Sequence, residues 1–386
     1  MACQGEVEEY PASDMRWGLA ATRGAFSTFH IDSDGLNTYI FCTNKDGSKF
    51  WVAVGPKDKS NASAFSSVKE SVAFHGGEGA DAQGDVQVEA VLLRPGTRLC
   101  VLPLQCSAAF SPISRYMRPN TPHAVLTPDA AICHGGHYLS TSTIRLTCHG
   151  YLMGFSLSTL ITNTSHTTEC QLLFRKMLGY YYEVYTQGQP DAGNGVIFTA
   201  SITMLIPSLK GPLETPVPQV PDVSNFNGLQ DLFSLCNIVE MANILHPESY
   251  SDEGLRVSVR QDMISGRALS RAIVAWVISN YDIEVVSTET FYWNYLAYQA
   301  HAVCFAKKFG DSKKAYSFTG VPLAKKVQNL IESSFHGIEK FWEQWDSFEG
   351  LEPQNFAWPN DDQLVVKTRT TKIKGAYTLV LANEPI

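Results

Sequence analysis

The sequence predicts an all-β sandwich or barrel followed by an α-helical region, a fold of mainly β structure plus α. Short β-rich runs fill the first half, a proline-rich segment follows, and apolar residues then recur at helical spacing. The five prolines of residues 207–221 mark a linker, because proline fits neither a helix interior nor a central strand. We therefore expect a β domain over residues 1–206, a helical domain over 222–350 and a tail over 351–386.

Eight β-rich runs are expected in the first half. Each is bounded by Gly, Pro, Asn or Asp, the residues that supply turn conformations, and residues 44–47 are typical of a hairpin turn. A Ser/Ala/Gly-rich insertion at about 57–85 interrupts the series. The expected strands are residues 17–22, 26–32, 37–43, 49–54, 86–103, 123–127, 131–139 and 143–151.

Helical periodicity begins with residues 169–185 and dominates after the linker. Apolar residues at i, i+3, i+4 and i+7 form stripes that are typical of helices packed on a core. The aromatic stretch at residues 291–295 is interpreted as core rather than as a recognition cage, and the basic run at 367–374 as a solvated strand or tail. The stripes lie at residues 229–239, 269–277, 292–304 and 327–341.

Composition and charge exclude several classes of protein. The 386 residues carry a net charge of −8, so the chain lacks the basic footprint of a nucleic-acid-binding protein and we expect no direct nucleic acid binding. No apolar run approaches the roughly 20 residues of a membrane-spanning helix, and the acidic N-terminus does not resemble a secretory signal. The nine cysteines are widely spread without a C-x-x-C pair, which favours reduced thiols in an intracellular protein.

One constellation of polar residues indicates chemistry. His30 and Asp32 are two residues apart, so on a strand both side chains would leave the same face. His123 follows a turn with two prolines and begins another expected strand. Two histidines and one carboxylate form the facial set of ligands that leaves positions open on Fe(II) in oxygenases. Lys49 opens an otherwise apolar strand and needs an anion, because an unpaired buried ammonium is costly.

These motifs together resemble the Jumonji C (JmjC) family. The resemblance covers residues 24–56 and 118–151, and it includes the stretch His123-Ala-Val-Leu-Thr-Pro-Asp129 with the glycine pair Gly135-Gly136. It is closest to the histone lysine demethylase branch of that family. The resemblance implies a cupin-type double-stranded β-helix, or jelly roll, that binds Fe(II) and the co-substrate 2-oxoglutarate.

The resemblance also implies an activity. With O2, such enzymes convert 2-oxoglutarate to succinate and CO2 while hydroxylating a substrate, and hydroxylation of methyl-lysine releases formaldehyde. We therefore expect a demethylase acting on a protein substrate such as a histone tail, inside the cell and in the nucleus. By the same resemblance, iron is held by His30, Asp32 and His123, and the co-substrate is bound by Lys49, Ser27 and Tyr39.

Several alternatives remain open. His137 stands where the demethylase branch commonly has asparagine, and 16 residues precede Trp17 where relatives have a longer section. The substrate could instead be a non-histone protein or a nucleobase, or the domain could be a catalytically silent cupin that only binds. The C-terminal helices are interpreted as a packing layer that also forms a homodimer or lines a substrate groove. A structural zinc site is a further alternative, with Cys133, His134, His137, Cys148 and His149 as its ligands.

Overall fold

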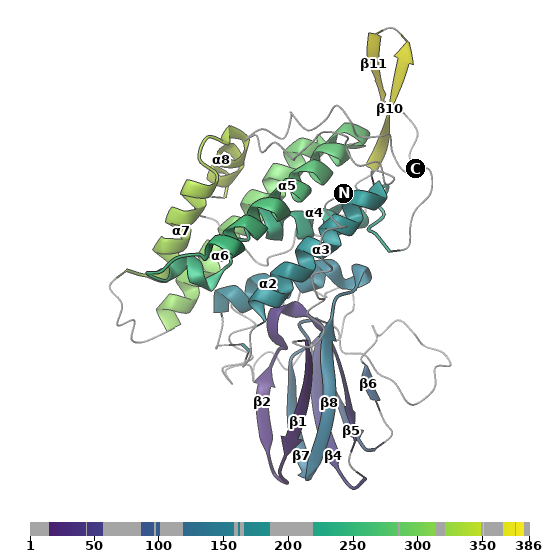
Figure 1. Cartoon of the computed structure of the whole chain (residues 1–386), viewed down its shortest axis with the longest axis vertical. Coiled ribbons are helices and arrows are strands. Elements are labelled where there is room, and N and C mark those ends of the chain that lie inside the picture. Colours follow the sequence, from purple (N-terminus) through teal and green to yellow (C-terminus); the bar gives the residue numbers. More distant parts are fainter. Residues whose placement is uncertain are drawn as a thin grey trace.

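The computed structural model combines antiparallel sheets with a larger set of helices (Figure 1). The expected insertion at 57–85 and residues 207–218 of the proline-rich segment lie outside the described residues. The structure describes residues 15–43, 45–56, 86–95, 98–100, 119–157, 161–162, 166–185, 219–284, 286–313, 321–348, 350, 366–374 and 376–381.

Eight strands form two four-stranded antiparallel sheets. They are β1 (Arg16–Ala21), β2 (Phe26–His30), β3 (Asn37–Cys42), β4 (Ser48–Pro56), β5 (Val86–Leu93), β6 (Arg98–Cys100), β7 (His123–Asp129) and β8 (Ala131–Tyr138). The first sheet has the order β1-β8-β3-β6 and the second the order β2-β7-β4-β5. Strands distant in the sequence are therefore neighbours in each sheet, which brings β2 against β7.

The two sheets pack face to face around a small apolar core. Ile40, Cys42 and Cys133 of the first sheet belong to one buried cluster with Trp51 and Val125 of the second. Since side chains alternate between the faces of a strand, this cluster identifies the inner face of every strand that contributes to it. That assignment decides which of the candidate residues can meet between the sheets.

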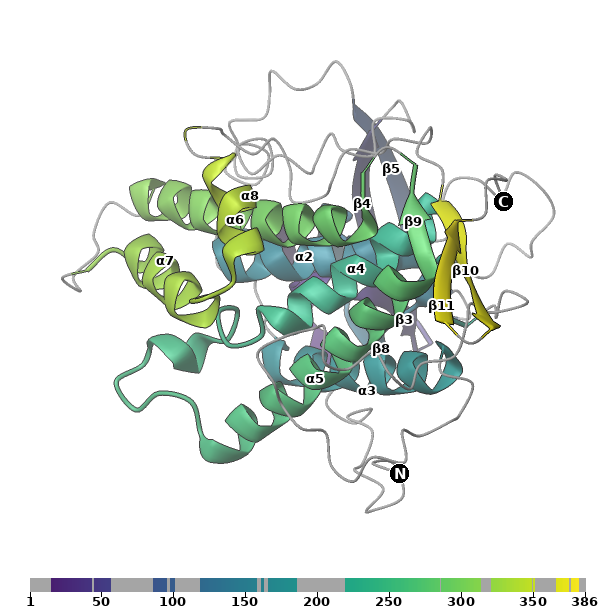
Figure 2. The ribbon, with the colours of Figure 1, turned by 90° about the horizontal axis from the view of Figure 1, so that it is seen from above.

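The helices lie over one end of the sheets (Figures 1 and 2). Among the described residues, no helix is both long and apolar enough to cross a bilayer. The helices are α2 (Ile144–Leu157), α3 (Thr167–Tyr185), α4 (Phe226–Glu240), α5 (Val257–Asn280), α6 (Thr288–Lys313), α7 (Leu323–Ser334) and α8 (Glu339–Asp346), with 3-10 turns η1 (Ser33–Gly35), η4 (Thr141–Thr143) and η7 (Pro247–Tyr250).

Large aromatic side chains fill the core between the helices. Tyr185 of α3 stacks on Trp276 of α5, with ring centroids 4.8 Å apart and an angle of 22° between the rings. Residues 291–295 were expected in the core, and Phe291, Tyr292 and Tyr295 of α6 are indeed buried there. The expected amphipathic stripes therefore correspond to the faces that hold the helices together.

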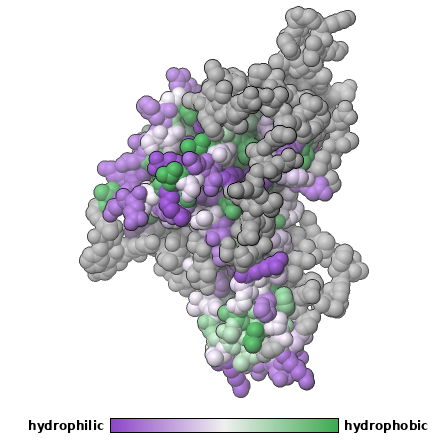
Figure 3. Space-filling view, viewed as in Figure 1, coloured by the Kyte–Doolittle hydropathy of each residue, from purple (hydrophilic) through white to green (hydrophobic). Residues whose placement is uncertain are grey.

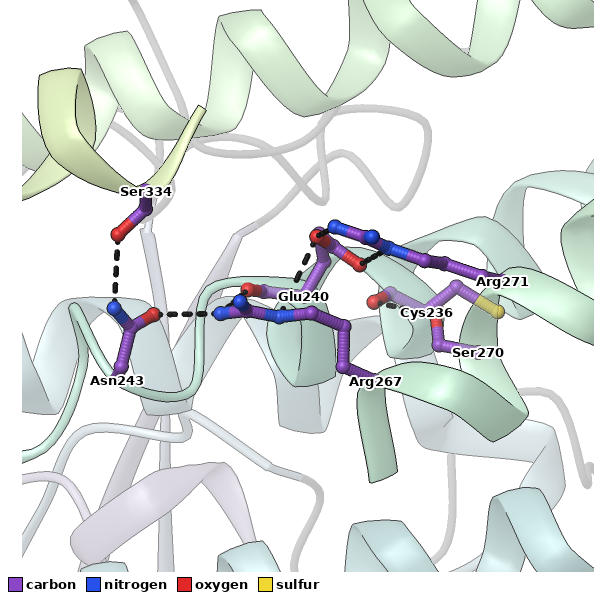
Figure 4. Close-up of polar contacts among 7 residues, drawn as sticks. All are labelled: Cys236, Glu240, Asn243, Arg267, Ser270, Arg271 and Ser334. Atoms are coloured by element: carbon purple, nitrogen blue, oxygen red, sulfur yellow. Dashed lines mark hydrogen bonds and ion pairs between the residues drawn. The ribbon is translucent and has the colours of Figure 1, made fainter. Parts of the chain in front are cut away.

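A buried ionic cluster joins α4 to α5 (Figure 4). The Glu240 carboxylate accepts hydrogen bonds from Nε and Nη2 of Arg271, and Arg267 Nε lies 3.4 Å from Glu240 Oε1. Arg267 Nη2 also donates to the backbone oxygen of Glu240 at 3.0 Å and to Oδ1 of Asn243 at 2.9 Å. Asn243 donates in turn to Ser334 of α7. Each charge in this cluster thus has a partner supplied by a neighbouring helix.

The C-terminal basic run forms a strand, as expected. It is β10 (Val366–Lys374), which pairs with β9 (Tyr281–Ile283) and β11 (Ala376–Leu381) in a third antiparallel sheet. Val366 is buried against the helical core, so the beginning of β10 is anchored to α5 and β9.

The strands also carry much of the exposed apolar surface. Figure 3 shows apolar side chains gathered over the sheet end of the molecule, below the mostly hydrophilic helices. Phe26 and Leu126 lie opposite each other on the outer face of the second sheet, and Ile132 lies on β8 of the first. Phe26 is 61% exposed, which shows how little the described residues cover this face.

A close glycine contact fixes the helices against the strands. Gly35 has a φ of 63°, a conformation that favours glycine, and a Cβ there would lie 2.4 Å from the Thr147 oxygen of α2. A Cβ on Gly150 would likewise lie 2.4 Å from the Cα of Gly35. The two glycines therefore let α2 pack directly on η1, the turn that follows Asp32.

The structure differs from the expectation at one strand and in the proportion of helix to strand. Residues 143–151 were expected as a strand, but Ile144, Cys148 and Tyr151 are buried at helical spacing in α2. The same apolar residues suit either structure, and packing on α4 and α6 favours the helix. α2 and α3 pack on later helices, so the helical core begins before residue 207. Among the described residues helix exceeds strand, contrary to the expected mainly β fold.

Candidate metal centre

Three polar side chains converge where β2 and β7 meet. His30 is the last residue of β2, His123 is the first residue of β7, and the two lie directly opposite each other with ring centroids 4.3 Å apart. Asp32 follows β2 by two residues. One ligand atom from each of the three side chains lies within 4.8 Å of the others. The sequence-predicted set of two imidazoles and one carboxylate is therefore brought together.

Asp32 reaches this point by a turn rather than by strand alternation. The strand expected over residues 26–32 ends at His30, and the backbone N–H of Ile31 donates to the oxygen of Ile161 at 2.9 Å. The pairing of β2 with β7 also shifts register between Ser27 and His30. The i, i+2 spacing predicted the right partners, but the chain leaves the sheet before the carboxylate.

Backbone carbonyls orient both imidazoles for metal binding. Nδ1 of His30 lies 2.7 Å from the oxygen of Thr28, and Nδ1 of His123 lies 3.0 Å from the oxygen of Thr121. A carbonyl only accepts, so each Nδ1 carries the proton. In the neutral form of each ring the lone pair is then on Nε2, and this is the form of histidine that binds a metal ion.

The electrostatic surroundings keep Asp32 ionised. Burial by itself raises the pKa of the Asp32 carboxyl. Attraction to His123 and His137 and the hydrogen bond from Thr38 outweigh burial, so the pKa lies below its ordinary value. Oδ1 of Asp32 lies 3.8 Å from Nε2 of His123. An ionised carboxylate oxygen thus lies beside an imidazole nitrogen, and both atom types are metal ligands.

Thr38 of β3 connects Asp32 to His137 of β8. Its hydroxyl donates to Oδ2 of Asp32 and lies 3.0 Å from Nδ1 of His137. Because the hydroxyl has a single proton, Nδ1 of His137 must be the donor in the second contact. This chain of hydrogen bonds holds one carboxylate oxygen in place and leaves the other to face His123.

Lys49 is a buried cation that pairs with a hydroxyl. It is 3% exposed on β4, and its Nζ donates to Oγ1 of Thr127 at 2.8 Å. No carboxylate among the described residues forms an ion pair with it. Burial lowers the pKa of the Lys49 ammonium, because the charged form loses its hydration there. The inward direction expected for this side chain is confirmed, and its positive charge lacks an anion.

Trp51 links the lysine to the histidines. It lies two residues after Lys49 on the same face of β4, and its ring stacks on His123 with centroids 4.8 Å apart and 19° between the planes. Its indole Nε1 is buried and has no hydrogen-bond acceptor among the described residues. The stack limits how the His123 ring can turn.

The remaining two predicted residues lie in different places. Ser27 is opposite Val125, so it belongs to the inner face of β2, but it is exposed at the edge of the sheet. Tyr39 lies between the inward-pointing Thr38 and Ile40, so its side chain leaves the outer face of β3. A Cβ on Gly136 would lie 2.8 Å from the Tyr39 hydroxyl, which locates that ring against β8. The structure does not bring Tyr39 to the candidate metal centre.

Three residues of the site were not singled out from the sequence. Thr127 and Trp51 carried a usable signal, because Thr127 is four residues after His123 and Trp51 two after Lys49, both even spacings on a strand. Thr38 carried none, since its role depends on β3 lying beside β8. All three side chains are buried at the inner face.

The donor set suits a redox-active divalent metal. Two histidine nitrogens and one carboxylate oxygen are typical ligands of non-haem Fe(II), and among the described residues no other group of three ligands converges in this way. The residues of the alternative zinc site lie apart. His134 leaves the face of β8 opposite to Cys133 and His137, and Cys148 and His149 are buried on α2.

No family model matches the chain, and no curated protein is similar to it in sequence.

Proposed function

We propose that this chain is an Fe(II)- and 2-oxoglutarate-dependent oxygenase of the JmjC type, with a cupin jelly roll formed by its two four-stranded sheets. Support comes from the strand order, from the apolar core between the sheets and from the ligand set at the end of β2 and β7. The resemblance of residues 24–56 and 118–151 to that family agrees with these features.

One observation carries the proposal. His123 of the metal-ligand set on β7 and Lys49 on β4 lie at inner-face positions with Trp51 between them, and Lys49 has no anionic partner among the described residues. A buried ammonium without a carboxylate is costly in a structural role, because the charge is desolvated without a counter-charge. A dicarboxylate that binds the metal at one end and Lys49 at the other satisfies both features together.

The residues of the site have separate roles. His30, Asp32 and His123 would hold Fe(II), which supplies the activation of O2 when bound. Lys49 and Thr127 bind the far carboxylate of 2-oxoglutarate, with the Ser27 hydroxyl at the open edge. Thr38 and Trp51 keep two of the ligands oriented, and the apolar core between the sheets excludes water.

The substrate class follows from the resemblance. We propose hydroxylation of a protein side chain, with demethylation of methyl-lysine in a histone-like tail as the first reaction to test, which would place the protein in the nucleus. Mass spectrometry of methylated and unmethylated peptides distinguishes the outcomes, since demethylation removes a methyl group and hydroxylation adds an oxygen. A nucleoside substrate set tests the nucleobase alternative in the same way.

The decisive experiment measures succinate. Full-length protein with Fe(II), 2-oxoglutarate and O2 should form succinate, and His30→Ala and Asp32→Ala should reduce this at least about a hundredfold, as expected when a metal ligand is removed. His134→Ala is the matched control, because His134 is exposed on the outer face of β8 and should retain full turnover. Folded His30→Ala protein that turns over as fast as wild type contradicts the proposal, and metal binding without turnover supports the silent cupin.

A further inference from the structure

Two buried cysteine thiols face each other between the sheets. Cys42 of β3 and Cys133 of β8 are opposite each other in the strand register, and they are 4% and 0% exposed. Their Sγ atoms are 3.3 Å apart, close enough for one thiol to donate a hydrogen bond to the other. Both are free thiols, so the contact is a dithiol and not a disulfide.

The ladder geometry allows these thiols to bond. The N–H of Thr43 donates to the oxygen of Ile132 at 2.8 Å, and these two residues form the next pair along the ladder after Cys42 and Cys133. Hydrogen-bonded and non-hydrogen-bonded pairs alternate in an antiparallel sheet, so the two cysteines occupy a non-hydrogen-bonded pair. The Cα atoms of such a pair are about 4.5 Å apart, which lies within the range that a disulfide spans.

The surroundings make the two thiols unequal. The hydrogen bond from Cys133 lowers the pKa of the Cys42 thiol, burial opposes this, and the nearby charge of Lys49 lowers it further. The same hydrogen bond and burial raise the pKa of Cys133, and the charge of Lys49 opposes them there too. For Cys148 on α2, by contrast, burial and the nearby Asp231 raise the pKa of the thiol. Lys49 favours a thiolate at this pair, and Cys42 is the more exposed of the two thiols, so we expect an oxidant to react first at Cys42.

We propose that Cys42 and Cys133 form a site of reversible oxidation that closes to a disulfide between β3 and β8 when the protein meets a peroxide. The Cys42 thiolate attacks one peroxide oxygen, the O–O bond breaks, the other oxygen leaves as hydroxide and takes up a proton to form water, and Cys42 becomes a sulfenic acid. The Cys133 sulfur then attacks the Cys42 sulfur, the S–S bond forms, and water leaves. Two thiols lose two electrons in total and the peroxide gains them. The proposal does not depend on iron or on 2-oxoglutarate.

The test uses hydrogen peroxide on folded, fully reduced protein. The protein is then unfolded in an alkylating reagent and digested, and the peptides are identified by mass. The expected result is a Cys42–Cys133 cross-linked peptide lighter by two hydrogens, formed at least about tenfold faster than Cys148 loses its free thiol. A thiol reductant should restore both alkylated peptides. Cys148 serves as the control within the same sample, because it is equally buried.

Two variants separate the roles of the thiols. In Cys133→Ser, Cys42 should accumulate as a sulfenic acid that a cyclic dione traps, since the second thiol is missing. In Cys42→Ser, Cys133 should remain a thiol as slow to react as Cys148. The proposal is overturned if Cys42 in Cys133→Ser reacts no faster than Cys148, or if peroxide joins Cys42 to a cysteine other than Cys133.

Discussion

Two buried charged clusters, one in each half of the molecule, differ in how their charges are neutralised. In the helical half, Glu240 faces Arg267 and Arg271, and Arg267 also donates to the backbone oxygen of Glu240 and to Asn243 (Figure 4). Between the sheets, Lys49 is as deeply buried as Glu240, and its partner among the described residues is a threonine hydroxyl. Each charge of the helical cluster faces an opposite charge, whereas among the described residues no counter-charge faces Lys49.

The difference separates structural from binding roles. A complete ionic cluster holds helices together, and removing one member leaves its partners buried and unpaired. An incomplete one lowers the stability of the free protein and gains from a ligand that completes it. Substitutions in the two clusters should therefore have opposite effects on the free energy of unfolding.

The largest effect is expected at Glu240. Glu240→Gln removes the negative charge that faces Arg267 and Arg271, and should lower the free energy of unfolding by about 3 kcal/mol. Urea denaturation at pH 7 measures this. Glu289→Gln is the control, since the ion pair of Glu289 with Lys340 is largely exposed and should contribute less than about 1 kcal/mol. Equal losses of unfolding free energy in the two variants would contradict a structural role for the Glu240 cluster.

A second structural effect in the helical half depends on pH. Burial lowers the pKa of His149 to about 4, whereas in the unfolded chain it lies near 6.5. As pH falls from 7 to 5, the unfolded state binds a proton that the folded state does not, so this residue should reduce stability by about 2 kcal/mol. Between pH 7 and 5, the His149→Gln variant should therefore lose about 2 kcal/mol less stability than wild type, as measured by urea denaturation midpoints. His134→Gln, at an exposed position, is the control and should lose as much stability as wild type between pH 7 and 5. The same loss in His149→Gln would contradict the prediction.

The metal centre should respond to a residue that touches no metal. Thr38→Val removes the hydroxyl that orients Asp32, and should weaken metal binding about tenfold. Titration calorimetry with Mn(II) measures the affinity without oxidation of the metal. Thr38→Ser keeps the hydroxyl and should restore the affinity, which a purely structural role of the threonine methyl would not do. Wild-type affinity in Thr38→Val would show that Asp32 is oriented by other contacts.

The smallest change in stability is expected at Lys49, and it is opposite in sign to the change at Glu240. Lys49→Met should raise the free energy of unfolding at pH 7 by about 1 kcal/mol, because a desolvated charge is replaced by an apolar chain of similar length. The same variant should lose the rise in melting temperature that 2-oxoglutarate produces in wild type.

The pH dependence of this difference has a definite sign. Since burial holds the pKa of Lys49 below its ordinary 10.5, the folded protein binds fewer protons than the unfolded chain as pH approaches that value. Wild-type stability relative to Lys49→Met should therefore rise from pH 7 to pH 10. A Lys49→Met protein destabilised as strongly as Glu240→Gln would place Lys49 among the structural residues and break the comparison.

Much of the architecture was accessible from the sequence because periodicity is a local signal. The strands that include His30, Lys49 and His123 were expected close to their observed bounds, and the helical stripes correspond to α4–α8. Residues 143–151 were misassigned because apolar and β-branched residues at mixed spacing suit a strand and a buried helix equally well. Only the packing of α2 against α4 and α6 decides between the two.

The sequence alone determined the residue types of the site and the direction of Lys49, since alternation along a strand depends on spacing. It could not determine the inner face of β3. The resemblance pointed to Tyr39, whereas its neighbour Thr38 reaches Asp32. Nor could it show that Cys42 lies opposite Cys133, because that contact requires β3 to pair with β8. Tertiary structure decided these points, since the pairing of distant strands is settled by burial of their inner faces together and not by local preference.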